Sequence, residues 1–169
     1  MNANEAPQNA QVTQSGQNTD TTHAPSHRHT PHTPSHRRAP DVWPTFQAHD
    51  APALIDFLVG TLGFLRTAVY EDGGRVAHAQ LDWPEGGGVM LGSHDPGAAE
   101  WCLEPGTFGA YVVTDHVDAL YRRLTEAGVK VLREIADQPY GSREFAVADP
   151  EGNKWSFGTY RGEPRPDQR

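Results

Sequence analysis

The same pattern of residues occurs twice in this chain, at a spacing of 65 to 66 positions. Each copy holds an aspartate, a stretch with apolar residues at helical spacing, and a glycine where that stretch stops. Asp50 and Gly63 bound the first stretch, and Asp115 and Gly128 bound the second. Aspartate is a good N-terminal cap of a helix, and glycine accepts the left-handed conformation that often follows one. The pattern predicts two helices, each begun by its aspartate and ended by its glycine.

Each predicted helix is followed by extended segments and by the turn sequence Pro-Glu-Gly. The turn occupies residues 84–86 in the first copy and 150–152 in the second, and a short apolar segment ends each copy. Caps, helix, turn and last segment agree at one offset, which indicates an internal duplication. The expected strands are residues 42–47, 65–70, 75–82, 88–92, 108–114, 130–136, 143–148 and 154–160. The predicted fold is α+β: two tandem βαβββ modules that form a curved mixed sheet, or cup, with the helices on its outer face.

The first forty residues differ sharply from this folded part. They are rich in Asn, Gln, Thr, Ser, Pro and His, with Met1 and Val12 as their large apolar residues. Such a stretch buries too little apolar surface to offset roughly 1–2 kcal/mol of backbone ordering per residue. We therefore expect a disordered tail over residues 1–40, a folded domain over 41–160 and a C-terminal tail over 161–169. Five histidines between residues 23 and 36 offer only weak, unselective metal binding, because nothing preorganises them.

Charge and cysteine content narrow the function and the location. The chain has 14 Lys and Arg against 22 Asp and Glu, and all but five of these lie after residue 40. An acidic domain without a basic stripe is a poor partner for nucleic acids or anionic membrane surfaces. The single cysteine, Cys102, excludes an internal disulfide and a cysteine-based zinc site. We expect a cytoplasmic protein that binds neither nucleic acid nor membrane.

Alternation along the strands separates residues that face the helices from residues that face the cup. In the last strand, Trp155 and Phe157 belong to the core and Ser156 to the opposite face. The cup face is too aromatic for open solvent and too polar for a dry core, as expected of a binding site. The expected ligand contacts, from this face and from the loop before the seventh strand, are Trp43, Gln47, His78, Gln80, Met90, Tyr111, Tyr140, Arg143, Glu144 and Ser156.

Two of these residues, His78 and Glu144, occupy equivalent positions in the two copies. A histidine and a carboxylate facing the same cup can act as a general base and its partner, or as ligands of a rearranged metal site. The alternative is that both are polar residues that hydrogen-bond within the sheet. The sequence leaves both interpretations open.

The two modules resemble a known superfamily. The sequences HDAPALIDFLVGTLGF in the first module and YGSREFAVADPEGNKWSFGTY in the second carry the resemblance, which covers residues 41–160. They resemble the vicinal oxygen chelate superfamily, which includes glyoxalase I, extradiol dioxygenases, fosfomycin-modifying enzymes and bleomycin-resistance proteins. The resemblance implies the fold; it leaves the activity open, because this family supports unrelated activities on one scaffold.

The resemblance also identifies where a metal would lie. Metal-dependent members hold one divalent ion in the cup, with His or Glu ligands from the first and last strand of each half. Alignment on the caps and turns places those positions at Trp43, Met90, Phe108 or Gly109, and Ser156. None of these side chains is the imidazole, carboxylate or thiolate donor that such an ion requires. We therefore expect no metal and no other cofactor.

These observations favour a metal-independent small-molecule binding protein, similar to bleomycin-resistance proteins, which sequesters a drug or toxin. An acidic domain with four tryptophans suits planar or cationic ligands, through contacts worth about 0.5–2 kcal/mol each. No catalytic residue is predicted. One alternative is a glyoxalase-like lyase, isomerase or dioxygenase-type enzyme with a non-standard site. Another is a non-catalytic interaction module whose cup is filled by its own side chains. Since family members commonly pair, we expect a homodimer.

Overall fold

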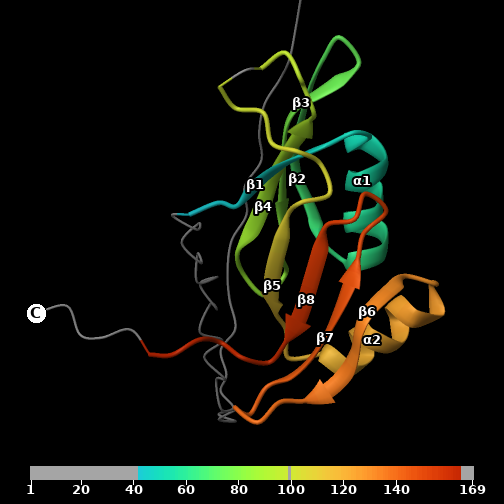
Figure 1. Cartoon of the computed structure of the whole chain (residues 1–169), viewed down its shortest axis with the longest axis vertical. Helices are drawn as coiled ribbons and strands as arrows, with labels where there is room; N and C mark the ends of the chain where they lie inside the picture. The colour runs from blue at the N-terminus through green and yellow to red at the C-terminus, as the bar shows by residue number, and fades with distance from the viewer. Residues whose placement is uncertain (1–41, 99, 165–169) are drawn as a thin grey trace, which may run out of the picture. The chain divides into compact units, whose positions relative to one another are not determined.

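A computed structural model of the chain describes residues 42–98 and 100–164 (Figure 1). The tail predicted over residues 1–40 lies outside the described residues, as do residues 41, 99 and 165–169. The proposed boundaries at residues 40 and 160 therefore stay predictions. No helix in the described part of the chain is long and apolar enough to cross a membrane.

The order of elements is strand, helix and three strands, and it occurs twice. The elements are β1 (Thr45–Ala48), α1 (Ala51–Phe57), η1 (Leu58–Leu62), β2 (Leu65–Asp72), β3 (Arg75–Asp82), β4 (Gly88–Ser93), β5 (Gly109–Val113), α2 (Val117–Glu126), β6 (Lys130–Asp137), β7 (Arg143–Ala148) and β8 (Lys154–Gly158). The predicted α+β fold of two βαβββ modules is confirmed. Three predicted strands were too long: the first begins at residue 45 instead of 42, the fifth spans 109–113 instead of 108–114, and the last ends at 158 instead of 160.

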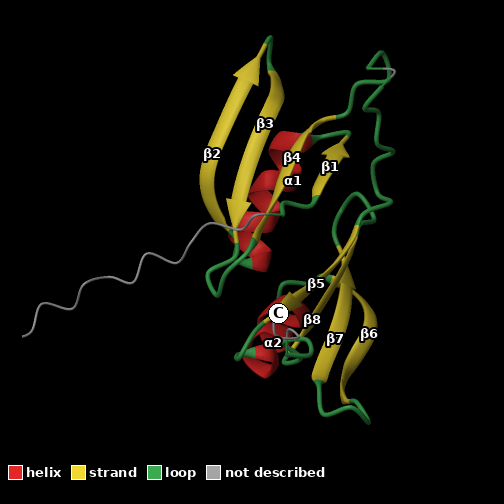
Figure 2. Cartoon of the chain, turned by 90° about the vertical axis from the view of Figure 1, so that its left-hand side faces the viewer, coloured by secondary structure: helices red, strands yellow, loops and turns green. Residues whose placement is uncertain are grey.

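Each module forms its own four-stranded mixed sheet, in the order β1-β4-β3-β2 and β5-β8-β7-β6 (Figure 2). The pairs β1–β4 and β5–β8 are parallel, and the other neighbours are antiparallel. In the parallel pairs Thr45 lies beside Met90, and Tyr111 lies beside Ser156. The register of the second sheet therefore repeats that of the first at an offset of 66 residues.

The helix ends follow the sequence closely, with one exception. The Asp50 carboxylate accepts a hydrogen bond from the Ala53 amide at 3.1 Å, so the predicted cap of the first helix is confirmed. Gly63 and Gly128 have φ angles of 97° and 72°, the left-handed conformation predicted for them. Asp115 was wrong as the second cap, because the cap position is held by His116.

The second helix is instead held at its start by a residue of the other module. Glu85, in the turn between β3 and β4, accepts hydrogen bonds from the Thr114 hydroxyl at 2.6 Å and from the Asp115 amide at 2.9 Å. The equivalent Glu151, between β7 and β8, accepts from the amides of His49 and Asp50 at 2.8 and 2.7 Å. The glutamate of each duplicated turn thus satisfies backbone donors at the helix start of the other module.

We expect Glu151→Gln to lower the free energy of unfolding by about 1 kcal/mol, the usual cost of losing a helix cap. The amide that replaces the carboxylate keeps one acceptor oxygen for two amide donors, and it removes a negative charge at the positive end of α1. Urea denaturation followed by circular dichroism measures the change.

Glu85→Gln should have a similar effect, because Glu85 also accepts two hydrogen bonds at the helix start of the other module. Glu100→Gln is the control, since Glu100 is exposed and lies outside both helix starts, and it should change stability by less than about 0.5 kcal/mol. Equal effects of all three substitutions would show that the hydrogen bonds of Glu85 and Glu151 to the other module do not contribute to stability.

The two modules share one apolar core. The predicted core residues on β4, β7 and β8 are all buried, with exposed fractions of 4% or less; they are Val89, Leu91, Phe145, Val147, Trp155 and Phe157. Trp155 of the second module contacts the rings of Phe46 and Phe64 of the first. The indole nitrogen of Trp83 also donates to the carbonyl oxygen of Val113 at 2.8 Å. The core therefore fixes the two sheets relative to one another.

Candidate binding pocket

A pocket of about 660 Å³ lies over the face of the second sheet that is turned away from the core. Its lining comes from every strand of that sheet and from the segments that flank β7 and β8. The residues that give it its chemistry are Tyr111, Arg133, Tyr140, Glu144, Ser156 and Tyr160. The volume falls within the range of 300–1,000 Å³ that is common for small-molecule sites. The three tyrosines are between 38% and 61% exposed, so their rings are open to a ligand.

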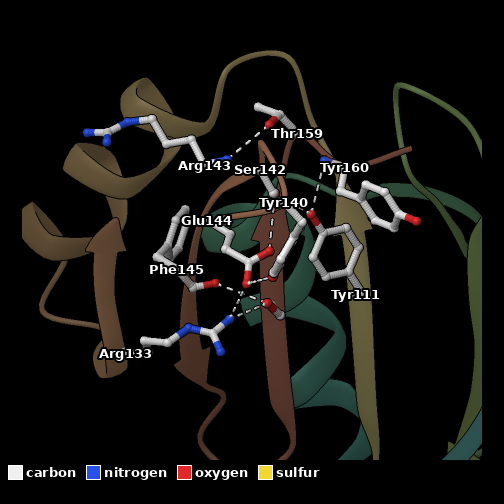
Figure 3. Close-up of polar contacts among 10 residues, drawn as sticks. Tyr111, Arg133, Tyr140, Ser142, Arg143, Glu144, Phe145, Thr159 and Tyr160 are labelled. Carbon is white, nitrogen blue, oxygen red and sulfur yellow. Dashed lines mark hydrogen bonds and ion pairs between the residues drawn. The ribbon is translucent and has the colours of Figure 1, made fainter. Parts of the chain in front are cut away.

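Glu144 lies at the base of this pocket and is 4% exposed (Figure 3). Its carboxylate accepts hydrogen bonds from the Arg133 guanidinium at 3.0 Å and the Tyr140 hydroxyl at 2.8 Å. The hydroxyl of Ser142 donates to the other carboxylate oxygen at 3.2 Å. A buried carboxylate is stable only when it is paired and hydrogen-bonded, and these three donors meet that condition. The bond to Glu144 also raises the pKa of Tyr140 above its ordinary value.

A chain of hydrogen bonds extends from Glu144 to the rim of the pocket. Because Ser142 donates to Glu144, its oxygen accepts from the Tyr111 hydroxyl at 3.1 Å. The Tyr111 oxygen in turn accepts from the backbone amide of Tyr160 at 3.1 Å. This chain fixes the Tyr111 ring and ties the segment after β8 to the pocket.

Arg133 reaches the pocket because of an irregularity in β6. Val131 pairs with Val147 on the core face, whereas Arg133 pairs with Ala146 on the opposite face, with a register shift between them. A bulge of this kind inserts an extra residue and reverses the direction of the side chains that follow. The first module has the same shift at the equivalent place in β2, between Arg66 and Ala68. Ala68 is the residue equivalent to Arg133 in the first module. This position therefore holds a charged side chain in the second module only.

Comparison with known proteins identifies the family. Residues 42–157 match the family model of the glyoxalase/bleomycin resistance protein/dioxygenase superfamily. The chain belongs to this superfamily.

The similarity to individual relatives covers most of the length of each relative. Protein Rv0887c of Mycobacterium tuberculosis is 34% identical over 125 residues, which cover 68% of this chain and 71% of that protein. Among solved structures, TioX from Micromonospora sp. ML1 has a TM-score of 0.60 and 28% identity, covering 68% of this chain and 94% of TioX. TnmS3 from Streptomyces sp. CB03234, described as an antibiotic binding protein, has a TM-score of 0.55 and 28% identity, covering 68% and 90%.

The strand register refines where a metal ligand of this superfamily would lie. The β1 neighbour of Met90 is Thr45 rather than Trp43, and the β5 neighbour of Ser156 is Tyr111 rather than residue 108 or 109. Trp43 precedes β1, because that strand starts three residues later than predicted. Within residues 42–98 and 100–164, no three His, Cys, Asp or Glu side chains come close enough together to hold an ion. The side chains at the positions given by the register are Thr45, Met90, Tyr111 and Ser156, and none of them is a His or Glu ligand of the superfamily's type. The expectation of a metal-free site stays a prediction.

The predicted ligand contacts divide between the two sheets. Tyr111, Tyr140, Glu144 and Ser156 come together in the pocket of the second module. The remaining residues of the predicted set, apart from Arg143, belong to the first module: Trp43, Gln47, His78, Gln80 and Met90.

The polar residues of the first module have local partners. Gln47 holds the segment after β4, because its amide donates to the Trp101 carbonyl at 2.9 Å and its oxygen accepts from the Leu103 amide at 3.2 Å. His78 lies beside the Tyr70 ring, with 6.2 Å between ring centroids. The amide of Gln80 donates to Asp82 at 3.0 Å. Since His78 and Glu144 lie on different sheets with different partners, they do not form an acid–base pair.

Arg143 lies on the other side of β7 from the pocket. Its guanidinium binds Asp118 of α2 at 2.9 Å and Asp137 at 3.0 Å, and in Figure 3 it points away from Glu144. The hydrogen bond from Arg143 lowers the pKa of Asp118. Arg143 was expected in the loop before the seventh strand, but it is the first residue of β7 and faces away from the pocket, because neighbouring residues of a strand face opposite sides and Glu144 faces the pocket. A contact between Arg143 and a ligand stays a prediction.

The pocket contains residues that the sequence analysis left out, chiefly Arg133 and Tyr160. Arg133 gave no signal, since simple alternation from Val131 assigns it to the core face. Tyr160 could have been predicted, because it lies four residues after Ser156, and in an extended strand such residues face the same side.

Proposed function

We propose that the chain is a metal-independent small-molecule binding protein that sequesters a drug or toxin in the pocket of its second module. The observation that carries the proposal is the internal bonding of the polar groups in that pocket. Glu144 accepts hydrogen bonds from Arg133, Tyr140 and Ser142, so its carboxylate is not free to take a proton from a substrate. What the pocket offers a ligand is chiefly aromatic surface.

The size and lining of the pocket support binding of a planar molecule. Tyr111, Tyr140 and Tyr160 present rings that stack on aromatic ligands. Tyr111 and Val113 also border a smaller apolar pocket of about 260 Å³, lined in part by Trp83 and Trp155. A ligand with an apolar extension would bury that part there. The likeness to the antibiotic binding protein TnmS3 supports the same role.

Titration of the full chain with bleomycin and with tricyclic aromatic compounds tests the proposal. The chain is first treated with EDTA and dialysed, and binding is followed by calorimetry. We expect saturable binding of one ligand per site for at least one compound, with the same affinity in EDTA. Binding that requires a divalent ion, or chemical conversion of the ligand, would overturn the proposal.

A pair of tyrosine variants locates the site. Tyr140→Ala removes a pocket ring and should weaken binding roughly tenfold. Tyr70→Ala is the matched control, because Tyr70 is 63% exposed and Tyr140 is 61% exposed, but Tyr70 lies on the first sheet. Equal effects of both variants would place the ligand elsewhere.

We also propose that the protein is a cytoplasmic homodimer. The edge strands β2 and β6 expose apolar side chains outside the pocket, since Leu65 is 54% exposed and Leu132 is 44% exposed. Pairing of two chains would cover such surface, as is common in this superfamily. Sedimentation at high micromolar concentration should show a dimer, and a monomer alone would contradict this proposal.

A further inference from the structure

The pocket of the second module differs in charge from the domain that contains it. Two arginines, Arg133 and Arg161, and one carboxylate, Glu144, line the pocket. Arg161 is paired with Asp115 at 2.7 Å, and Glu144 is paired with Arg133 at 3.0 Å. The surplus of acidic residues in the chain therefore does not make the pocket itself acidic.

The carboxylate of Glu144 is not available to a cationic ligand. It is buried and already accepts three hydrogen bonds from protein groups. A ligand ammonium could reach it only by displacing Arg133, which would leave that guanidinium without its partner. Distant acidic residues add little attraction, because exposed charges farther apart than about 8 Å are largely screened at physiological salt.

The guanidinium of Arg133 is available to an anionic ligand. Its side chain is 51% exposed, and its bonds to Glu144 and Ser156 both come from Nη2. Its Nη1 and Nε make no hydrogen bond to any residue that the structure describes. A guanidinium carries five N–H donors and no acceptor, so these two nitrogens can donate hydrogen bonds to an acidic group of a ligand. The planar group also stacks on aromatic rings and binds carboxylates through two parallel hydrogen bonds.

On the basis of the proposed function, we propose that the ligand is a planar aromatic compound bearing a carboxylate or an ionised phenol, which Arg133 recognises. The tyrosine rings hold the planar part, and the open edge of the guanidinium binds the acidic group. This inference reverses the preference for cations that the composition of the domain suggested.

Three probes with one ring system test the inference on the full chain. They are anthracene-2-carboxylate, 2-(aminomethyl)anthracene and 2-(hydroxymethyl)anthracene, titrated by calorimetry at physiological salt. We expect the carboxylate to bind at least about tenfold more tightly than the ammonium compound, with the alcohol between them, as for a hydrogen bond between charged groups. An ammonium compound that binds as tightly as the carboxylate would overturn the inference while leaving the proposed function intact. If neither bleomycin nor any of the probes binds, the proposed function itself fails.

Substitutions test whether Arg133 causes the preference for the carboxylate over the ammonium compound. Arg133→Met should abolish or invert the preference, because it leaves the Glu144 carboxylate without its cationic partner. Glu144→Gln should strengthen carboxylate binding several-fold, since it removes the competing negative charge, and it serves as the test if Arg133→Met does not fold. Arg66→Met is the control, because Arg66 is 48% exposed and is likewise paired with a carboxylate, that of Asp56. A carboxylate preference that survives Arg133→Met, or that Glu144→Gln weakens, would overturn the inference.

Discussion

Trp155→Ala should lower the free energy of unfolding by about 3–5 kcal/mol, as is usual when a large buried ring is removed. The Trp155 side chain is 0% exposed. Its ring centroid lies 5.4 Å from those of Phe64 and Phe108 and 6.1 Å from that of Phe46. Its indole nitrogen also donates to the Asp149 carboxylate at 3.0 Å. The substitution removes contacts to both modules at once, so we expect them to unfold together at a lower urea concentration.

Trp101→Ala is the matched control for this experiment. Trp101 is 63% exposed, and the Gln47 amide bonds to its backbone carbonyl, which the substitution keeps. We expect a change within about 0.5 kcal/mol. Far-UV circular dichroism in urea measures both variants without depending on indole fluorescence. A loss of stability as small for Trp155 as for Trp101 would show that the shared core is not what joins the modules.

Gly158→Ala should disrupt the pocket. A methyl group at this position would clash with the Tyr111 hydroxyl, and it would lie 2.9 Å from Tyr111 Cζ and 2.8 Å from Glu144 Cβ. The Tyr111 ring would have to leave its place, which breaks its hydrogen bonds to Ser142 and to the Tyr160 amide. We expect a loss of roughly 1–3 kcal/mol in stability, as for other overpacked sites, and at least tenfold weaker binding of the ligand found by titration.

Gly109→Ala gives the control, because Gly109 lies on the same strand as Tyr111. The nearest atom to its added methyl group would be the Lys154 carbonyl oxygen at 3.8 Å, an ordinary contact. Stability and affinity should stay close to those of the unaltered chain. Unchanged ligand binding by Gly158→Ala would contradict the assignment of the site to this pocket.

The duplication explains why much of the fold could be predicted from the sequence. A weak sequence pattern becomes convincing when it recurs at the same offset. The repeat therefore predicted the strands, the helix ends at Gly63 and Gly128, and the core residues Trp155 and Phe157. The cap at Asp115 did not follow. Its carboxylate pairs with Arg161, and the start of α2 is held by Glu85 of the other module. Such a contact depends on how the modules pack, which a local pattern does not contain.

The candidate site was predictable only where the strands are regular. Tyr111 and Ser156 were found because they lie in uninterrupted strands with a period of two. Arg133 was missed because a bulge precedes it, and nothing in the residue types of β6 marks the extra residue. Arg143 was included because the loop before the seventh strand was expected to close over the cup, whereas the residue opens β7 on its other face.

The hydrogen bonds of Glu85 and Glu151 connect groups that lie far apart in the sequence, as does the packing around Trp155. None of these contacts involves Pro96 or Gly97, two exposed residues in the segment that joins β4 to β5. If the peptide chain were cut in that segment, each fragment would carry half of one core and one of the two glutamates. Folding would then become an association of two fragments, and its midpoint would depend on protein concentration.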